Sequence, residues 1–542
     1  MSTTNWIFAD VYEGIAAAVP DRPCFAQGDR MVTWGEADER ADALAADMLA
    51  AGIGRQGKVA CYLYNCTEYL ETVLAAFKAS LVPVNTNFRY GPEEILYLFD
   101  NADAEAVVFH ATFTELVEGI RDRLPNVKRW YVVADDAGTG PEWATPYEDV
   151  VTSGARLDPR PERSGDDLLF LYTGGTTGMP KGVMWRQDDL FNVIGAAGNA
   201  LLGVPPATGV AEVVERAVAN PNPPRTIVCC PLMHGTGQFS SFISMNGGGT
   251  VITLADRKFD VGQLFETVER WRATNLVIVG QAFAGPMLDH LDADPGRYDL
   301  SSLVSIGSSG VMWSHDNKQG LLRHMPQVLL MDSFGSSEAV GLGISVSGAG
   351  QAEETARFMI TENNAVFTDD GRRVEPGSGE MGMVAVGGFI PVGYYKDEAK
   401  SAATFRTIEG RRWSIPGDFA TVNADGSIHL LGRGSVCINT GGEKVFPEEV
   451  EEALKTHPTV RDAVVVGIPD ERFGETICGV VEAAEGAPID GAELRAHVAT
   501  QLAAYKAPRN VVIVDTIGRA ANGKVDYKRL KGVAVAELAT RT

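Results

Sequence analysis

Hydrophobic positions along the chain follow two alternating patterns. Short apolar runs bounded by turn residues predict buried strands, which span 59–64, 106–110, 130–134, 168–172, 275–279 and 328–331. Between them, apolar residues recur at helical spacing and predict amphipathic helices, which span 36–51, 70–80, 92–101 and 261–273. Strands that alternate with helices indicate an α/β fold of parallel sheets with helices on their faces.

One proline-rich stretch, residues 203–225, interrupts this alternation. It surrounds a short helical patch at 210–218. We interpret the stretch as a surface excursion that is either a mobile flap or a plain connector.

Length and charge narrow the class of protein. A chain of 542 residues is too long for one hydrophobic core, so several domains are expected. The formal net charge of −24 argues against a nucleic-acid-binding protein, and an anionic ligand must therefore be held by local donors. The 7 cysteines form no C-x-x-C pair, and the sequence has neither a signal peptide nor an apolar run of about 18 residues. We expect a cytoplasmic protein without a transmembrane segment, and a homodimer is compatible with the sequence.

Charge also divides the chain. Residues 433–542 are close to neutral and contain a basic stretch at 505–531, whereas residues 1–432 carry most of the negative charge. This asymmetry predicts two domains, 1–432 and 433–542, with the boundary between Gly432 and Arg433.

The segment from Tyr172 to Gly182 has the composition of a phosphate-binding loop. Its glycines let successive backbone N–H groups surround an anion, while its threonines and its lysine add donors and a positive charge. The candidate residues are Thr173, Gly174, Gly175, Thr176, Thr177, Gly178 and Lys181. A flexible surface turn is the alternative, and the spacing differs from that of a Walker A loop.

A second glycine–lysine segment lies near the C-terminus, at 518–524. It matches G-x-x-x-x-G-K, but Val525 stands where a Walker A loop needs Ser or Thr. We therefore reject an NTPase interpretation and retain Lys524 as a lysine in a glycine-flanked loop.

Two carboxylates have positions that suit a nucleotide site. Glu338 ends the segment Asp332-Ser-Phe-Gly-Ser-Ser-Glu, which follows a predicted strand, and there it suits Mg²⁺ or caps a helix. Asp418 follows Pro416-Gly417 in a predicted turn, where a lone aspartate is most often structural. In a nucleotide site it would accept hydrogen bonds from both ribose hydroxyls.

In this order, the segments resemble those of the adenylate-forming superfamily, which includes acyl-CoA synthetases, firefly luciferase and the adenylation domains of peptide synthetases. Six blocks across about 500 residues carry the resemblance. They are Thr33–Glu36, Tyr172–Gly182, Phe334–Glu338, Pro416–Asp418, 432–451 and Lys524. The resemblance implies a large N-terminal part of stacked α/β subdomains with a small β-rich module, hinged to a small mobile C-terminal α/β domain.

The resemblance also implies a reaction and its site. A carboxylic acid attacks the α-phosphorus of ATP to give an acyl-adenylate and pyrophosphate, and the thiol of coenzyme A then displaces AMP. Lys524 would bridge the acyl carboxylate and the α-phosphate, Glu338 and Thr176 would hold Mg²⁺, and His234 would close the channel between the acyl and thiol sites. The remaining nucleotide or cofactor contacts implied are Thr173, Gly174, Gly175, Thr177, Gly178, Lys181, Ser309, Gly310, Ser333, Phe334, Gly335, Ser336, Ser337, Asp418, Arg433, Gly441, Gly442 and Glu443. Val436 occupies the hinge position, where the family usually has Asp or Lys.

The sequence also restricts the class of carboxylic acid that the protein would activate. No carboxylate lies between Pro231 and Gly249 to pair with an ammonium group, which disfavours an α-amino acid. Small residues line the region where the family holds its acyl group and predict a roomy, apolar tunnel; they are Gly235, Gly237, Gly280, Ala282, Ala284, Gly285 and 307–310. Among family members the chain is most similar to bacterial ligases of long-chain fatty acids or steroid side-chain acids. The alternatives are an aryl or medium-chain acid ligase, a luciferase-like oxygenase and a silent adenylate-binding protein.

Overall fold

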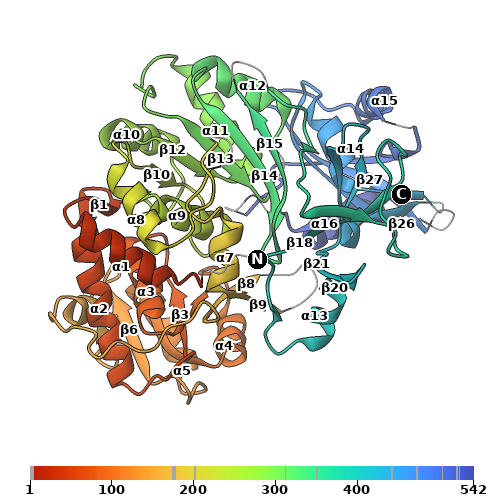
Figure 1. The fold of residues 1–542 in the computed structure, drawn as a ribbon. Helices are drawn as coiled ribbons and strands as arrows, with labels where there is room; N and C mark the ends of the chain where they lie inside the picture. The colour runs from red at the N-terminus through yellow and green to blue at the C-terminus, as the bar shows by residue number, and fades with distance from the viewer. Residues whose placement is uncertain are drawn as a thin grey trace.

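The computed structural model describes residues 5–173, 179–199, 203–311, 313–348, 352–440, 443–470, 474–502, 504–520, 523 and 525–541. Four sheets organise this part of the chain (Figure 1). Two of them have eight described strands each and are mainly parallel, a third is antiparallel, and the fourth belongs to the C-terminal unit. The fold is therefore α/β with a β-rich module and a C-terminal α/β unit, as the sequence predicts.

The first large sheet has the order β15-β14-β13-β12-β10-β11-β1-β2. Its strands from β14 to β1 are parallel, and β15 and β2 add antiparallel edges. In chain order the strands are β1 (Pro23–Gln27), β2 (Arg30–Thr33), β10 (Arg225–Val228), β11 (Thr250–Thr253), β12 (Asn275–Ile278), β13 (Ser305–Ser309), β14 (Leu329–Ser336) and β15 (Ala339–Ser347).

The second large sheet has the order β19-β9-β8-β4-β3-β5-β6-β7. Its strands are β3 (Lys58–Tyr62), β4 (Val82–Asn85), β5 (Ala104–His110), β6 (Arg129–Val133), β7 (Thr145–Pro146), β8 (Leu168–Thr173), β9 (Lys181–Arg186) and β19 (Gly393–Tyr394). Strand β8 runs parallel to β4 and antiparallel to β9, so the chain turns back between β8 and β9. In the sequence, the predicted phosphate loop lies between these two strands.

Two smaller sheets follow. The antiparallel module contains β16 (Arg357–Phe358), β17 (Asn364–Phe367), β18 (Met381–Gly387), β20 (Phe405–Ile408), β21 (Arg411–Ser414), β22 (Asp418–Val422) and β23 (Ile428–Arg433). The C-terminal sheet contains β24 (Ile438–Thr440), β25 (Glu443–Val445), β26 (Val460–Asp470), β27 (Gly474–Ala483) and β28 (Asn510–Val514). Sheet membership thus changes between Arg433 and Ile438.

Helices cover the sheets. In the N-terminal part they are α1 (Phe8–Ala18), α2 (Trp34–Ala50), α3 (Thr67–Lys78), α4 (Pro92–Asn101), α5 (Thr114–Arg121), α6 (Tyr147–Val151), α7 (Gln187–Val193), α8 (Val210–Ala219), α9 (Gly235–Asn246), α10 (Val261–Trp271), α11 (Gly280–Ala293), α12 (His315–His324) and α13 (Glu398–Thr404). The C-terminal unit, blue in Figure 1, adds α14 (Pro447–Lys455), α15 (Gly491–Gln501) and α16 (Tyr527–Arg541). None of the helices in the described ranges has both the length and the apolar character needed to cross a membrane.

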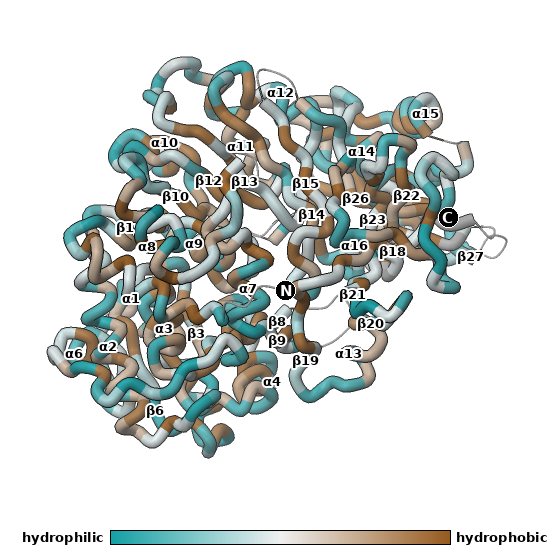
Figure 2. The backbone as a smooth tube through the Cα atoms, in the orientation of Figure 1, coloured by the Kyte–Doolittle hydropathy of each residue, from teal (hydrophilic) through white to brown (hydrophobic). Residues whose placement is uncertain are grey.

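Local sequence explains where several elements begin. Thr33 and Glu36 form a capping box at the start of α2, because each side chain accepts a hydrogen bond from the backbone N–H of the other. Pro92 occupies the first turn of α4, where a missing N–H is harmless. The predicted strands and helices are confirmed, with hydrophobic segments running through the sheets in Figure 2. The prediction at 328–331 is too short, because β14 continues to Ser336 as one arm of a hairpin with β15.

The proline-rich excursion contains the predicted helix, α8. Its side chains Val213 and Ala217 are buried, and α8 packs closely on α1 at Gly14, where an added Cβ would lie 2.8 Å from Val214. Arg22 also donates a hydrogen bond to the carbonyl of Ala217 at 2.9 Å. This anchoring favours a connector over a mobile flap.

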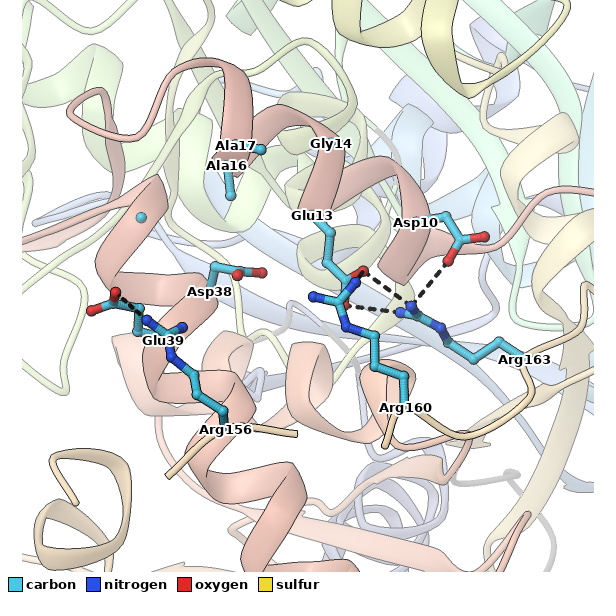
Figure 3. Close-up of a pocket in the computed structure, with 11 residues that line it drawn as sticks. Asp10, Glu13, Gly14, Ala16, Ala17, Asp38, Glu39, Arg156, Arg160 and Arg163 are labelled. Atoms are coloured by element: carbon cyan, nitrogen blue, oxygen red, sulfur yellow. Dashed lines mark hydrogen bonds and ion pairs between the residues drawn. The ribbon is translucent and has the colours of Figure 1, made fainter. Parts of the chain in front are cut away.

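A polar cavity of about 530 Å³ lies between α1, α2 and the segment 156–163 (Figure 3). Its charges are paired with one another. Glu13 contacts Arg160 at 2.9 Å and Arg163 at 3.0 Å, and Arg163 also lies 3.4 Å from Asp10. These ion pairs fasten the segment to α1.

Candidate active site

The candidate site lies at the carboxyl ends of β8, β12, β13 and β14, where loops of separate elements meet. Gly310 follows β13 with a φ of +91°, and an added Cβ there would lie 3.8 Å from Val279 and 4.0 Å from Thr236 at the start of α9. From the C-terminal unit, Gly523 approaches the same place, since its Cβ would lie 2.8 Å from Val311. The carboxyl ends of parallel strands are where α/β folds bind ligands.

Several predicted residues lie outside the described residues. They are Gly174, Gly175, Thr176, Thr177, Gly178, Gly441, Gly442 and Lys524. Their roles stay predictions. The described flanks of the loop are Thr173, which ends β8, and Lys181, which begins β9. The described neighbour of Lys524, Gly523, brings that loop to the carboxyl end of β13.

Two asparagines, the buried Asn85 and the half-buried Asn65, hold the turn that carries His234. Asn85, at the end of β4, donates hydrogen bonds to the carbonyls of Tyr172 at 2.9 Å and Met233 at 2.6 Å. Asn65 accepts from the backbone N–H of Leu232 at 2.7 Å. These bonds tie the end of β8 to the turn, so the half-buried His234 has a fixed position immediately before α9.

Gly237 explains why this turn is built from small residues. An added Cβ at Gly237 would lie 2.5 Å from the carbonyl oxygen of Pro231, which no real side chain tolerates. Gly307 differs, because the nearest atom to its added Cβ is the carbonyl oxygen of Leu276 at 3.9 Å. Gly237 is thus required for close packing, whereas Gly307 leaves open space beside the strand. The apolar tunnel for the acyl group stays a prediction.

Glu338 lies in the turn between β14 and β15, so the alternative that it caps a helix is wrong. Its carboxylate is 9% exposed and accepts a hydrogen bond from the hydroxyl of Tyr394 at 2.8 Å. The turn is fixed on both sides of it, since Trp185 donates to the carbonyl of Ser337 at 3.0 Å and Ser414 donates to that of Glu338 at 2.6 Å. A single oriented carboxylate of this kind suits Mg²⁺, which keeps several waters and takes other ligands from phosphate.

Strands β13 and β14 bring more of the predicted residues together. Ser309 is in register with Ser333, which is exposed. Phe334 packs at 5.5 Å from Phe358, and an added Cβ at Gly335 would lie 3.0 Å from the carbonyl oxygen of Ala339. The hydroxyl of Ser336 is buried and has no hydrogen-bond partner within the described chain. This hydroxyl is therefore available to hydrogen-bond a bound molecule or water.

Asp332, at the start of the segment Asp332–Glu338, has a structural role in the core. It is buried, lies 3.2 Å from the buried ammonium group of Lys318, and has a pKa raised to about 6 by burial. This ion pair anchors β14 to α12.

Lys181 forms an ion pair with the carboxylate of Asp397. Asp397 precedes α13 and caps that helix with its other oxygen, which accepts from the backbone N–H of Lys400 at 2.9 Å. The hydrogen bond from Lys181 lowers the pKa of Asp397, so this carboxylate is ionised near neutral pH.

Asp418 is the first residue of β22, so the prediction that it lies in the turn is corrected by one position. One carboxylate oxygen accepts from Arg433 at 3.1 Å, and the other is buried without a hydrogen-bond partner among the described residues. Burial raises the pKa of Asp418, and Arg433 opposes that shift. A buried carboxylate oxygen without a donor fits a ligand that supplies hydroxyl groups.

The C-terminal unit contacts this place through Glu448 of α14. Glu448 accepts a hydrogen bond from the backbone N–H of Arg433 at 3.4 Å, and an added Cβ at Gly432 would collide with its carboxylate at 2.2 Å. Burial and the nearby Glu451 raise the pKa of Glu448 to about 8. Gly432, with a φ of +126°, thus lets α14 approach the end of β23.

A second cavity, of about 390 Å³, borders the His234 turn and lies between the two large sheets. Its lining joins the aromatic rings of Tyr64 and Phe88 to charges of both signs, and Arg257 is paired with Asp135 at 2.8 Å. The charged residues are Arg30, Arg89, Arg257, Glu68, Asp135, Asp136 and Asp256. The guanidinium of Arg257 lies 4.5 Å from the ring centroid of Tyr64. Cations beside aromatic rings suit a ligand that has both phosphate and a planar base.

Sequence reasoning missed the residues that hold the predicted groups in place. The sequence predicts no role for Asn65, Asn85, Tyr394 or Asp397. A usable signal was present for Asn85, because an asparagine that ends the otherwise apolar run Val82–Asn85 is polar at the carboxyl end of a parallel strand.

Comparison with known proteins agrees with this architecture. Residues 12–395 match the family model described as AMP-binding enzyme, and residues 449–524 match the AMP-binding enzyme C-terminal domain. The chain is 41% identical to the Medium/long-chain-fatty-acid--CoA/3-oxocholest-4-en-26-oate--CoA ligase of Mycolicibacterium smegmatis, covering 97% of this chain and 96% of that protein. It is 40% identical to the 3-oxocholest-4-en-26-oate--CoA ligase of Rhodococcus rhodochrous, covering 96% and 95%.

Solved structures share the fold. The anthranilate CoA ligase AuaEII in complex with anthranoyl-AMP superposes with a TM-score of 0.83 at 22% identity, covering 99% of this chain and 98% of that one. ATP-bound MatB from Rhodopseudomonas palustris superposes with a TM-score of 0.78 at 23% identity, covering 97% and 98%.

Proposed function

The chain belongs to the family of AMP-binding enzymes and is an AMP-forming acyl-CoA ligase, and we propose that it activates a medium- or long-chain fatty acid or the side-chain acid of a steroid. The observation that carries the proposal is the 41% identity to a ligase of that description across nearly the whole of both chains. The site supports nucleotide binding, because a carboxylate oxygen of Asp418 and the hydroxyl of Ser336 are buried and have no hydrogen-bond partner among the described residues.

The first half-reaction joins the acid to the α-phosphorus of ATP and releases pyrophosphate. The carboxylate of the acid is the nucleophile and pyrophosphate is the leaving group, so no side chain of the protein has to form a covalent bond. The protein positions the two substrates and stabilises the negative charge that develops at the phosphate. We assign Asp418 to the ribose hydroxyls, because its second oxygen has no donor within the described chain. We assign Lys181 and the loop before it to the outer phosphates, and Lys524 to the negative charge that gathers at the α-phosphate.

Mg²⁺, when bound, supplies positive charge to the phosphates. Glu338 and Thr176 would hold it. The single carboxylate of Glu338 fits this ion, because Mg²⁺ in nucleotide sites takes most of its ligands from phosphate and water. Tyr394 keeps that carboxylate oriented.

In the second half-reaction the thiol of coenzyme A displaces AMP from the acyl-adenylate. Lys524 must leave first, so the boundary at Gly432–Arg433 serves as the hinge. We assign the phosphates of coenzyme A to the mouth of the cavity of about 390 Å³ that borders Pro231, because Arg89 lines it, whereas the charge of Arg257 is paired with Asp135 at 2.8 Å. His234, three residues after Pro231, would close the channel between that cavity and the adenylate site. On this assignment Arg89→Ala raises the KM for coenzyme A about tenfold and leaves pyrophosphate release unchanged.

Coenzyme A-dependent AMP release across a panel of acids tests the proposal. The panel contains palmitate, octanoate, benzoate and a cholestenoic-type acid. We expect turnover with palmitate or the steroid acid at least ten times faster than with benzoate, because a flexible or bulky apolar acid gains from a roomy site. A preference for benzoate would contradict the assigned substrate class, and no AMP release with any acid would contradict the ligase activity.

A further inference from the structure

One short segment touches two polar groups that the proposed function uses. This segment, Gly393–Asp397, is named here the 393–397 strap. It adds β19 to the edge strand β9, with Tyr394 in register with Val183, and the backbone N–H of Tyr395 donates to the carbonyl of Gly182 at 2.8 Å. The strap is thus fixed directly beside Lys181, at the end of the phosphate loop.

Tyr394 directs its hydroxyl at Glu338. The side chain is 6% exposed, its ring packs 5.8 Å from that of Phe405, and its hydroxyl donates to the carboxylate at 2.8 Å. A tyrosine hydroxyl donates one hydrogen bond, and here its acceptor is one oxygen of Glu338. One oxygen of Glu338 is therefore oriented while its other oxygen is left for a cation or a cation-bound water.

Asp397 directs its carboxylate at Lys181. Its two oxygens act separately, since one caps α13 through Lys400 and the other pairs with the ammonium group. The lysine side chain is 39% exposed and would otherwise be free to rotate. An ammonium group has three donors, so one bond to Asp397 leaves two for phosphate oxygens.

We propose that Tyr394 and Asp397 are positioning residues, through which the 393–397 strap holds the magnesium carboxylate Glu338 and the phosphate cation Lys181 at a fixed spacing before the nucleotide arrives. The inference rests on the proposed roles of those two residues. A metal-site carboxylate needs such outer partners, because they set its orientation. A lysine has a long flexible stem, so fixing it in advance reduces the entropy lost on binding.

Two other residues of the 393–397 strap, Tyr395 and Lys396, give control variants for this proposal. The hydroxyl of Tyr395 donates to Asp103 at 2.7 Å, and Lys396 pairs with the same Asp103 at 2.8 Å. Tyr395→Phe and Lys396→Gln therefore remove one hydroxyl and one ion pair from the same segment without touching Glu338 or Lys181. Tyr394→Phe and Asp397→Asn are the matching test variants, and asparagine retains the ability to cap α13.

Calorimetric titration of ATP at several Mg²⁺ concentrations gives the test without turnover. We expect Tyr394→Phe to raise the Mg²⁺ concentration needed for half-maximal ATP binding about tenfold, as loss of an outer partner does. We expect Asp397→Asn to weaken ATP binding about threefold at saturating Mg²⁺, as a partly exposed ion pair allows. Tyr395→Phe and Lys396→Gln should match the wild type.

Double variants separate positioning from general damage. The effect of Tyr394→Phe should disappear in a Glu338→Gln background, and that of Asp397→Asn in a Lys181→Ala background. The inference is overturned if the test variants match their controls, if the effects persist in these backgrounds, or if Asp397→Asn tightens ATP binding, which would make Asp397 a competitor of phosphate. Wild-type protein that binds Mg²⁺ and ATP but activates no acid would refute the proposed function and leave the inference standing.

Discussion

The N-terminal body and the C-terminal unit meet at the candidate site in different ways. In the body, Asn85, Glu338 and Asp418 are at most 9% exposed, and each forms hydrogen bonds with a residue that is distant in the sequence. The C-terminal unit approaches through the Gly523 loop and through Glu448, which rests on the glycine at the end of β23. The groups of the body are thus held in place within it, while the C-terminal unit reaches the site through one loop and one side chain.

Charge follows the same division. In the body, the carboxylate of Asp418 faces Arg433 and that of Asp397 faces Lys181. At the contact between the two parts, Glu448 is buried beside another carboxyl group, Glu451, and its pKa is raised to about 8. This contact between the two parts therefore rests on a protonated carboxyl group and not on an ion pair. The four predictions below test this difference.

The largest effect is expected for the cation of the C-terminal unit. Lys524→Ala should lower the rate of adenylate formation at least about 1000-fold, because a preorganised positive charge is lost from the reacting phosphate. Thioesterification of supplied acyl-adenylate should change less than about threefold. Single-turnover assays of each half-reaction measure both rates, with the exposed Lys528→Ala as the matched control. An equal loss of rate in both half-reactions would contradict the assignment of Lys524 to adenylate formation alone.

In the body, Glu338→Gln should raise the Mg²⁺ requirement of adenylate formation about 100-fold, since an amide is a much poorer ligand than a carboxylate. Glutamine still accepts the hydrogen bond from Tyr394, so the turn keeps its shape. A magnesium titration of pyrophosphate release reports the change. An unchanged titration curve would show that the carboxylate plays no part in holding the ion.

Packing in the body gives the third prediction. Gly237→Ala should lower the free energy of unfolding by about 1–3 kcal/mol, because its Cβ would meet the Pro231 carbonyl oxygen at 2.5 Å. Gly285→Ala is the control, since its Cβ would lie 3.4 Å from the flexible end of Gln281. Urea denaturation of both variants measures the difference. Equal stability of the two would mean that the His234 turn is not held as tightly as the contact implies.

The smallest effect concerns pH. The pKa of Glu448 is about 8 in the folded protein and near 4.5 when unfolded. Between these values the folded protein holds a proton that the unfolded chain has released, so this residue makes stability fall as pH rises from about 4.5 to about 8. Glu448→Gln should flatten that fall and raise the melting temperature at pH 8 by a few degrees.

Melting curves from pH 5 to pH 8 measure this change. Glu398→Gln, an exposed glutamate in the first turn of α13, is the control and should leave the pH dependence unaltered. A variant of Glu448 with the wild-type slope would indicate that the carboxyl is solvated rather than buried.

The strands, the helices and the candidate site residues could be predicted from the sequence, but the contacts between those residues could not. The α/β alternation and the helix 92–101 follow from apolar periodicity, which acts locally. Glu338 and Asp418 could be singled out because they belong to recurring motifs. The bonds from Asn85 to Met233 and from Tyr394 to Glu338 join residues that are 148 and 56 positions apart, so no local pattern reveals them.

The central claim is that a lysine of the C-terminal unit meets an ATP held by the body and drives formation of an acyl-adenylate. Exchange of labelled pyrophosphate into ATP, with Mg²⁺, palmitate and no coenzyme A, tests it most directly. The account predicts acid-dependent exchange by the wild type and none above background for Lys524→Ala. Exchange that persists in Lys524→Ala, or its absence from the wild type with every acid of the panel, would contradict the account.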